Sequence, residues 1–206
     1  LAASSSVFRG AVEALRQPLE SRTVTIARAK STAEYPADFI FIGTANPCPC
    51  GFYGTKKDCR CTPSAIERYR RKLSGPILDR IDIYVDVHEI DNSKLLAGQS
   101  SAEKDQTTRA KSNIAKARLV QHERFKSVQT SNASMSNRDI KAHAKLDEKA
   151  KEMLDTAANT FGLSARAYMR AVKVARTIAD LDDSDAILPK HVAEALQYRP
   201  HQFHDK

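Results

Sequence analysis

The pattern of apolar and polar positions divides the chain into a mixed part and an all-helical part. In the mixed part, helical periodicity and strand-like alternation follow one another. This pattern predicts a helix within the segment 6–20 that Pro18 stops, strands over 23–28 and 38–46, a helix over 62–73, and a strand over 82–90. The run "DFIFIGTAN" is continuously apolar until its polar end, which is typical of a strand buried on both faces of a parallel sheet. The order of elements predicts an α/β sheet domain with too few strands to be complete, so it resembles the second half of a larger sheet.

After a polar linker over 91–100, the helical period continues almost to the end of the chain. Helices are expected over 101–127, 136–145, 147–161, 165–181 and 189–199. Capping residues mark their boundaries: Ser136, Asp147, Gly162, Ser164 and Pro189. The segment "SNASMS" predicts a flexible loop between the first two helices, and residues 201–206 predict a tail. The predicted fold class is therefore α/β followed by a helical domain of about a hundred residues.

Composition adds an excess of positive charge, since 33 Lys and Arg oppose 25 Asp and Glu and give a net charge of +8. An excess of this kind favours an anionic partner such as nucleotide or nucleic acid. The candidate nucleic-acid residues lie in the window 55–72: Lys56, Lys57, Arg68, Arg70, Arg71 and Lys72. The alternative is a solvated helix face. Because the chain lacks Trp and has 6% aromatic residues, base stacking is not the expected mode of binding.

Two features predict the compartment. No run of about 18 apolar residues occurs, so no membrane-spanning helix is expected. The opening "LAASSSVFRG" lacks the basic-then-apolar order of a secretory signal, so a cytoplasmic location is expected.

All four cysteines of the chain lie within "NPCPCGFYGTKKDCRC", residues 46–61. The candidate metal ligands are Cys48, Cys50, Cys59 and Cys61. Four thiolates can satisfy a tetrahedral Zn²⁺, although one residue between paired cysteines gives a tight chelate. Gly51 and Gly54 make it easy for the segment between the pairs to fold back. A structural Zn²⁺, four reduced thiols and disulfides remain alternatives, and cytosolic redox conditions disfavour the disulfides.

Two polar residues lie at the ends of predicted strands and are candidates for binding a ligand. Asn46 ends the strand 38–46, and ligands of open α/β sheets bind beyond the carboxyl ends of strands. Its carboxamide could hold both a water molecule and an anionic oxygen. Arg80 ends a short helix before the strand 82–90, from where it could reach a phosphate on a neighbouring subunit. The simpler alternatives are a turn residue before Pro47 and, for Arg80, a salt bridge to Asp79 or Asp82.

Several longer motifs resemble a known family. The segments "NPCPCG", "RCTP", "RYRRKLSGPILDRIDIYV", "GLSARAYMRAVKVARTIADL" and "HVAEALQYRP" look like the bacterial magnesium-chelatase-like AAA+ ATPases of the ComM (YifB) type. The resemblance runs from about residue 8 to residue 200 and implies the second half of an AAA+ core over 1–90 and a helical lid over 101–200. It also implies an ATP-driven hexameric ring that uses ATP with Mg²⁺. The ComM type is associated with branch migration of DNA.

The resemblance also implies roles for single residues. Asn46 matches the sensor-1 position, which orients the attacking water. Arg80 matches an arginine finger that acts on the ATP of the next subunit, and Arg166 matches the sensor-2 arginine at the start of a lid helix. The alternative for Arg166 is a surface helix residue.

The sequence departs from the family in two ways. It has no G-x-x-x-x-G-K-S/T motif, and alanine and serine stand before Phe8 where the Mg²⁺-associated Asp-Glu pair would fall. We therefore expect the chain to begin partway through the ATPase core and to be inactive alone. Two other functions remain open: a zinc-stapled DNA-binding module without ATPase activity, and a chelatase-type motor that acts on a protein partner.

Overall fold

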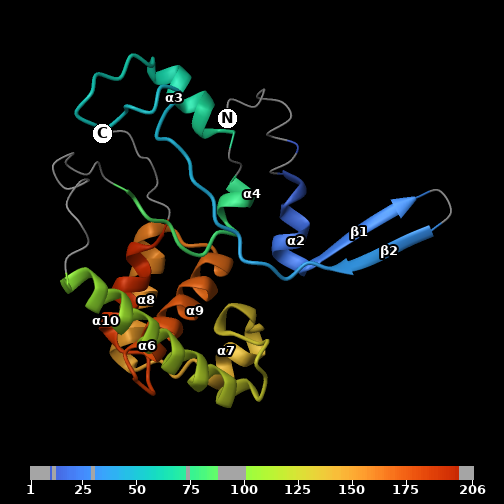
Figure 1. The fold of residues 1–206 in the computed structure, drawn as a ribbon, viewed down its shortest axis with the longest axis vertical. Coiled ribbons are helices and arrows are strands. Elements are labelled where there is room, and N and C mark those ends of the chain that lie inside the picture. Colours follow the sequence, from blue (N-terminus) through green and yellow to red (C-terminus); the bar gives the residue numbers. More distant parts are fainter. Residues whose placement is uncertain (1–9, 11–12, 29–30, 73–74, 88–100, 200–206) are drawn as a thin grey trace. The chain divides into compact units, whose positions relative to one another are not determined.

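The computed structural model describes residues 10, 13–28, 31–72, 75–87 and 101–199 (Figure 1). The chain divides into two compact units: the mixed unit, residues 1–81 with 87–89, and the helical unit, residues 82–86 with 90–206. The predictions for Phe8, the linker 91–100 and the tail 201–206 lie outside the described residues.

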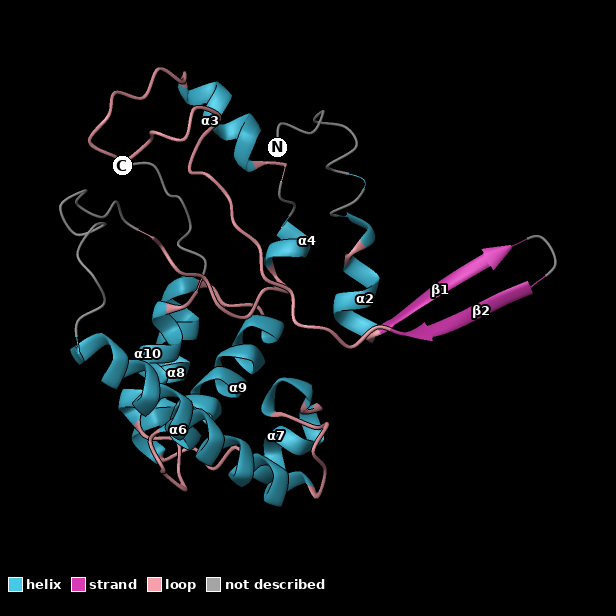
Figure 2. Ribbon diagram, in the orientation of Figure 1, coloured by secondary structure: helices cyan, strands magenta, loops and turns pink. Residues whose placement is uncertain are grey.

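The mixed unit contains a small two-stranded sheet and short helices (Figure 2). Its elements are α2 (Arg16–Ser21), β1 (Thr23–Arg28), β2 (Ser31–Pro36), α3 (Pro63–Arg70) and α4 (Gly75–Leu78). The predicted strand 23–28 is confirmed as β1, which pairs antiparallel with β2 so that Arg28 lies opposite Ser31. β2 is polar and mostly exposed, so the pattern of apolar positions in the sequence does not predict it as a strand.

Pro18 does not end the first helix, so that prediction is wrong. It is the third residue of α2, and proline is tolerated in the first turn because the N–H groups there have no intrahelical acceptor. The helix ends instead at Arg22, which adopts a left-handed φ of 58° and donates its N–H to the Pro18 carbonyl at 2.9 Å.

The predicted strands over 38–46 and 82–90 do not form among the described residues. The segment 38–46 has no ladder partner, and the side chains of Ile40 and Ile42 are 85% and 86% exposed. Residues 82–87 are also without a strand assignment. A strand buried on both faces needs neighbouring strands for its hydrogen bonds and its burial. Among the described residues, β1 and β2 pair with each other and leave the segments 38–46 and 82–87 without such neighbours.

The helical unit contains a helix in each of the five ranges predicted between residues 101 and 199. Its elements are α6 (Ser101–Phe125), the 3₁₀ helix η1 (Asn132–Ser134), α7 (Asn137–His143), α8 (Glu148–Phe161), α9 (Ala165–Leu181) and α10 (Pro189–Gln197). The fold class, a mixed α/β part followed by an all-helical part, is confirmed. None of the helices in the described part of the chain combines the length and the apolar character needed to cross a membrane.

Three side chains predicted to cap the starts of helices, those of Ser136, Asp147 and Ser164, accept hydrogen bonds from backbone N–H groups. The Ser136 hydroxyl accepts from the Asp139 N–H, and the Ser164 hydroxyl accepts from the Ala167 N–H. Asp147 caps α8, which ends at Gly162 with a φ of 61°, a conformation that favours glycine. These local signals place the helices because capping residues satisfy N–H groups within their own first turn.

The core of the helical unit forms around α9, which contacts α6, α7, α10 and η1. Its small residues Ala171, Ala175 and Ala179 are buried at a spacing of four, so they lie on one face and admit close neighbours. Leu154, Ile187 and other apolar side chains complete the cluster.

The segment 131–136 is not a flexible loop, so that prediction is wrong. Asn132 is 1% exposed. Its amide donates to the Asp180 carboxylate at 2.7 Å and to the Thr177 hydroxyl at 3.1 Å, and its carbonyl oxygen accepts from Arg124 at 2.8 Å. These hydrogen bonds tie the segment to α9 and α6, to residues that are distant in the sequence.

Candidate functional site

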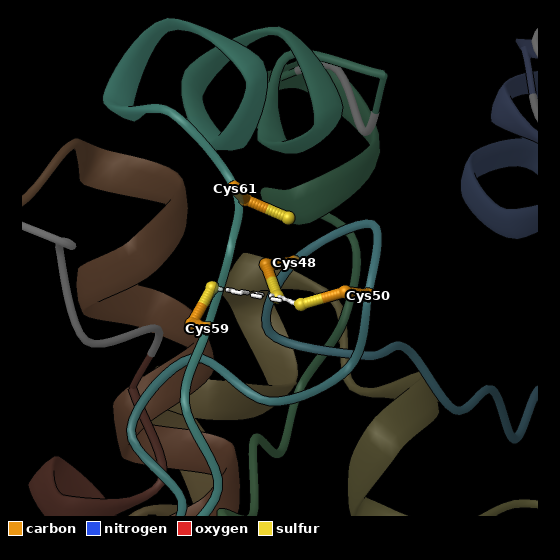
Figure 3. Close-up of side chains that lie close together, drawn as sticks. All are labelled: Cys48, Cys50, Cys59 and Cys61. Carbon is orange, nitrogen blue, oxygen red and sulfur yellow. Dashed lines mark hydrogen bonds between the residues drawn. The ribbon is translucent and has the colours of Figure 1, made fainter.

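The four cysteine side chains converge within one loop of the mixed unit, the cysteine loop, residues 46–61 (Figure 3). The Cys48 Sγ lies 3.3 Å from that of Cys50 and 3.7 Å from that of Cys59, and the last two are 3.6 Å apart. All four sulfur atoms lie within 4.8 Å of one another. The four thiols are free and are close enough to hold one metal ion.

Two tight turns fold the cysteine loop back on itself. The Gly51 N–H donates to the Cys48 carbonyl at 3.0 Å, and the Thr55 N–H donates to the Phe52 carbonyl at 3.1 Å. Gly51 and Gly54 adopt φ values of 83° and 79°, which residues with a Cβ rarely reach. The turns explain how the paired cysteines meet across eight intervening residues.

The surroundings of Cys48, Cys59 and Cys61 shift the pKa values of these thiols in different directions. Burial opposes ionisation of Cys48, but hydrogen bonds from the Tyr53 N–H and the neighbouring thiols prevail and lower its pKa to about 6. The Cys61 N–H acts to lower the pKa of Cys59, yet burial and the neighbouring thiols raise it to about 12. Hydrogen bonding from the Cys50 N–H likewise lowers the pKa of Cys61, but burial and the thiols of Cys50 and Cys48 give a net increase. The surroundings therefore favour a thiolate at Cys48 over one at Cys59 or Cys61.

Asn46 begins the cysteine loop. It is exposed, and a Cβ added to Gly51 would lie 3.7 Å from the Asn46 Nδ2, so its side chain lies beside the first turn. The strand that should end at Asn46 is absent. The structure instead places the carboxamide beside Gly51, in the first turn of the cysteine loop.

The predicted basic residues lie in the cysteine loop (Lys56 and Lys57), on α3 (Arg68 and Arg70) and directly after α3 (Arg71 and Lys72). Thr62 caps this helix by accepting from the Ala65 N–H, and Ile66 is its buried residue. Lys56, Arg68 and Arg71 are exposed, and Arg71 forms an ion pair with Glu67. The name basic patch is used below for Lys56, Lys57, Arg68, Arg70, Arg71 and Lys72.

Three cations of the basic patch stack on aromatic rings, which the sequence reasoning did not find. The Arg70 guanidinium lies 5.1 Å from the Tyr53 ring centre, Lys57 lies 5.2 Å from that of Phe52, and Lys72 lies 5.5 Å from that of Tyr69. The signal was present in the sequence, because Tyr69 lies within the basic window 55–72 and Phe52 and Tyr53 lie just before it. The contact with Arg70 connects the cysteine loop to α3.

Arg80 follows α4, and its N–H donates to the Ile77 carbonyl at 2.9 Å. Its guanidinium forms an ion pair with Glu20 rather than with Asp79 or Asp82, the partners suggested by sequence proximity. Asp82 instead pairs with the Arg170 Nε at 3.3 Å within the helical unit. Glu20 is 60 residues from Arg80, so nothing local in the sequence identifies this partner.

Arg166 is the second residue of α9 and is exposed. The first turn of a helix directs N–H groups and the positive end of the helix dipole outward, which suits an anion. Arg166 belongs to the helical unit, whereas Asn46 and Arg80 belong to the mixed unit.

In a comparison with known proteins, both parts of the chain match models of the same protein. The model of magnesium chelatase, subunit ChlI, matches residues 4–95, and the model of the ChlI C-terminal part matches residues 104–199. Competence protein ComM of Haemophilus influenzae is 39% identical over 192 residues, which are 93% of this chain and 36% of that protein. The uncharacterized protein YifB of Escherichia coli is 36% identical over 195 residues, 93% of this chain and 37% of that protein. The chain thus spans little more than a third of these relatives, and it belongs to the magnesium-chelatase-like family of the ComM and YifB type.

Proposed function

We propose that this chain is part of a ring-forming AAA+ ATPase that couples ATP binding and hydrolysis to the remodelling of DNA. The observation that carries the proposal is the match of both parts of the chain to the models of the magnesium-chelatase subunit ChlI. In this proposal residues 1–90 contribute the second half of the ATPase core and residues 101–200 contribute the helical lid. ATP and Mg²⁺ require the further length that the relatives possess.

Three residues contribute to the proposed ATP site. Asn46 orients the attacking water, because a carboxamide can both accept from water and donate to a phosphate oxygen. Arg80 acts on the ATP of the adjacent subunit, where a planar guanidinium neutralises charge that develops on the γ-phosphate. Arg166 contacts the nucleotide from the first turn of α9. A site of this kind is complete only when subunits assemble.

Replacing Asn46 by alanine in the full-length polypeptide is expected to lower kcat for ATP hydrolysis about 10²–10³-fold, the effect of losing one well-placed polar group at the reacting centre. The Kd for ATP should change little, because the role of Asn46 concerns the water. The measurements are steady-state hydrolysis and equilibrium binding of a fluorescent ATP analogue. Asn159→Ala, at an exposed asparagine of α8, is the matched control. Hydrolysis by Asn46→Ala at the rate of this control would refute the assignment.

A second function, a zinc-stapled DNA-binding module without ATPase activity, is favoured by the basic patch. Its cations lie on α3 and on the adjoining cysteine loop, and stacking on Tyr53 and Phe52 holds two of them. Side chains held in this way lose less conformational freedom when they bind phosphate. The two functions differ in one requirement, since the module binds DNA as the 206-residue chain alone.

Replacing Lys56, Arg68 and Arg71 together by glutamine is expected to weaken DNA binding and to reduce the slope of log K against log salt by about 0.9 for each phosphate contact removed. These three side chains are exposed, so the fold should be unaffected. Fluorescence anisotropy of labelled duplex DNA at several salt concentrations measures both quantities. The matched control replaces Lys141, Lys149 and Lys151, which are exposed on α7 and α8. Equal affinity and slope in both triple variants would reduce the basic patch to a solvated face.

A further inference from the structure

We propose that Cys48, Cys50, Cys59 and Cys61 bind a single Zn²⁺ ion that ties the segment after Asn46 to the start of α3. Binding of the ion depends on neither ATP hydrolysis nor DNA. Its consequence for Asn46 rests on the proposed function above, and the two are separated by the measurements below.

The separations of the sulfur atoms fit one tetrahedral ion. Zn–S bonds of about 2.3 Å place the ligands of a tetrahedron about 3.8 Å apart. The separations among Cys48, Cys50 and Cys59 are 3.3–3.7 Å, and Cys61 completes a set within 4.8 Å. Disulfide sulfurs lie about 2.0 Å apart, so this arrangement of free thiols corresponds to none of the three possible disulfide pairings. It is also too tight for a cluster of several iron atoms.

The ligand set determines the kind of ion. All four donors are sulfur, which selects zinc or iron over the oxygen-seeking Mg²⁺ and Ca²⁺. Four protein ligands also leave no open position for substrate, as in structural rather than catalytic zinc sites. The Cys48 side chain is 0% exposed, and its Sγ accepts from the Tyr53 N–H at 3.4 Å. Backbone donors of this kind orient a thiolate ligand and offset its charge.

The position of the cluster gives the ion a mechanical role. Its first ligands follow Asn46, and its last ligand, Cys61, directly precedes Thr62, the cap of α3. Between the two pairs lies Tyr53, whose ring stacks on Arg70 of the same helix. One ion therefore fixes both ends of the cysteine loop: the end at Asn46 and the end that leads into α3. Few apolar side chains are buried there, so the metal supplies the order that a core would otherwise provide.

The first test measures metal content in the 206-residue chain purified without chelators. Elemental analysis should find one zinc per chain, and Co²⁺ exchanged into the site should show the visible absorption of a tetrahedral tetrathiolate complex. Cys61→Ser should weaken Zn²⁺ binding by roughly 100-fold or more. The control Arg60→Gln lies between the last two ligands, is exposed, and should bind Zn²⁺ as the unaltered chain does.

The second test measures order in the loop. Removing zinc with a strong chelator should accelerate trypsin cleavage after Lys56, Lys57 and Arg60 at least 10-fold, while circular dichroism of the helices stays unchanged. Stoichiometric iron, or metal-free protein with four thiols reactive towards a thiol reagent and no Co²⁺ absorption, would overturn the zinc assignment. Cleavage that does not change when zinc is removed would overturn its role as a staple. Full zinc occupancy with unimpaired ATP hydrolysis in Asn46→Ala would contradict the proposed role of Asn46 alone.

Discussion

Replacing Asp180 by alanine is expected to destabilise the helical unit by about 3–5 kcal/mol, the cost of removing one partner from a buried ion pair. The Asp180 carboxylate accepts from Arg124 at 2.5 and 2.8 Å, from the Arg176 Nε at 3.0 Å and from Asn132 at 2.7 Å. The Arg176 side chain is 1% exposed. Burial lowers the pKa of Arg176, and Asp180 opposes that shift. Without Asp180, two guanidinium groups would face each other with no shared anion.

Urea unfolding followed by circular dichroism measures this loss of stability. Asp105→Ala, at an exposed aspartate of α6, is the matched control and should change the free energy of unfolding by less than about 0.5 kcal/mol. Asp180→Asn keeps the shape of the side chain and removes its charge, so it should fall between the two. If Asp180→Ala unfolds at the same urea concentration as Asp105→Ala, the network does not hold α6, η1 and α9 together.

Replacing Arg80 by alanine in the full-length polypeptide is expected to lower kcat for ATP hydrolysis about 10³–10⁵-fold, the range measured for arginine fingers. In the proposed role, the substitution removes a positive charge opposite the γ-phosphate as it is transferred. Arg80→Lys should rescue little of the activity, because an ammonium group lacks the planar, two-pronged geometry of the guanidinium. Steady-state hydrolysis with and without DNA gives the rates.

Two controls separate this effect from misfolding. Arg118→Ala removes an exposed arginine of α6 and should leave hydrolysis unchanged. Glu20→Gln removes the ion-pair partner of Arg80 without removing the guanidinium, so it should retain far more activity than Arg80→Ala. If Arg80→Ala turned over ATP like Arg118→Ala, Arg80 would be a structural residue that pairs with Glu20.

The helical unit could be predicted from the sequence because its signals are local. Ser136, Ser164 and Gly162 act within one turn of the helix ends that they define, and each forms the predicted cap. The segment 131–136 shows the limit of such reasoning. Its composition is that of a loop, but Asn132 is fixed by Thr177 and Asp180, which are 45 and 48 residues away.

The mixed unit was harder to predict because its elements depend on distant partners. The apolar run 38–46 indicates burial, yet a sequence does not say which strands supply it, and β1 pairs with the polar β2 instead. Arg80 pairs with Glu20, which no local pattern connects to it. The clustering of the cysteines was evident in the sequence. The structure adds the turns at Gly51 and Gly54, which bring the four sulfur atoms together. The resulting arrangement favours a single metal ion over disulfides.

Under the proposed function, Asn46 of one subunit and Arg80 of the next complete one ATP site. The most direct measurement mixes full-length Asn46→Ala and Arg80→Ala proteins, each inactive alone, under conditions in which rings exchange subunits. About a quarter of the interfaces formed by random assembly would join an intact Asn46 to an intact Arg80. ATP hydrolysis is expected to return on mixing to a corresponding fraction of the unaltered rate. Mixed rings that form and still fail to hydrolyse ATP would contradict it.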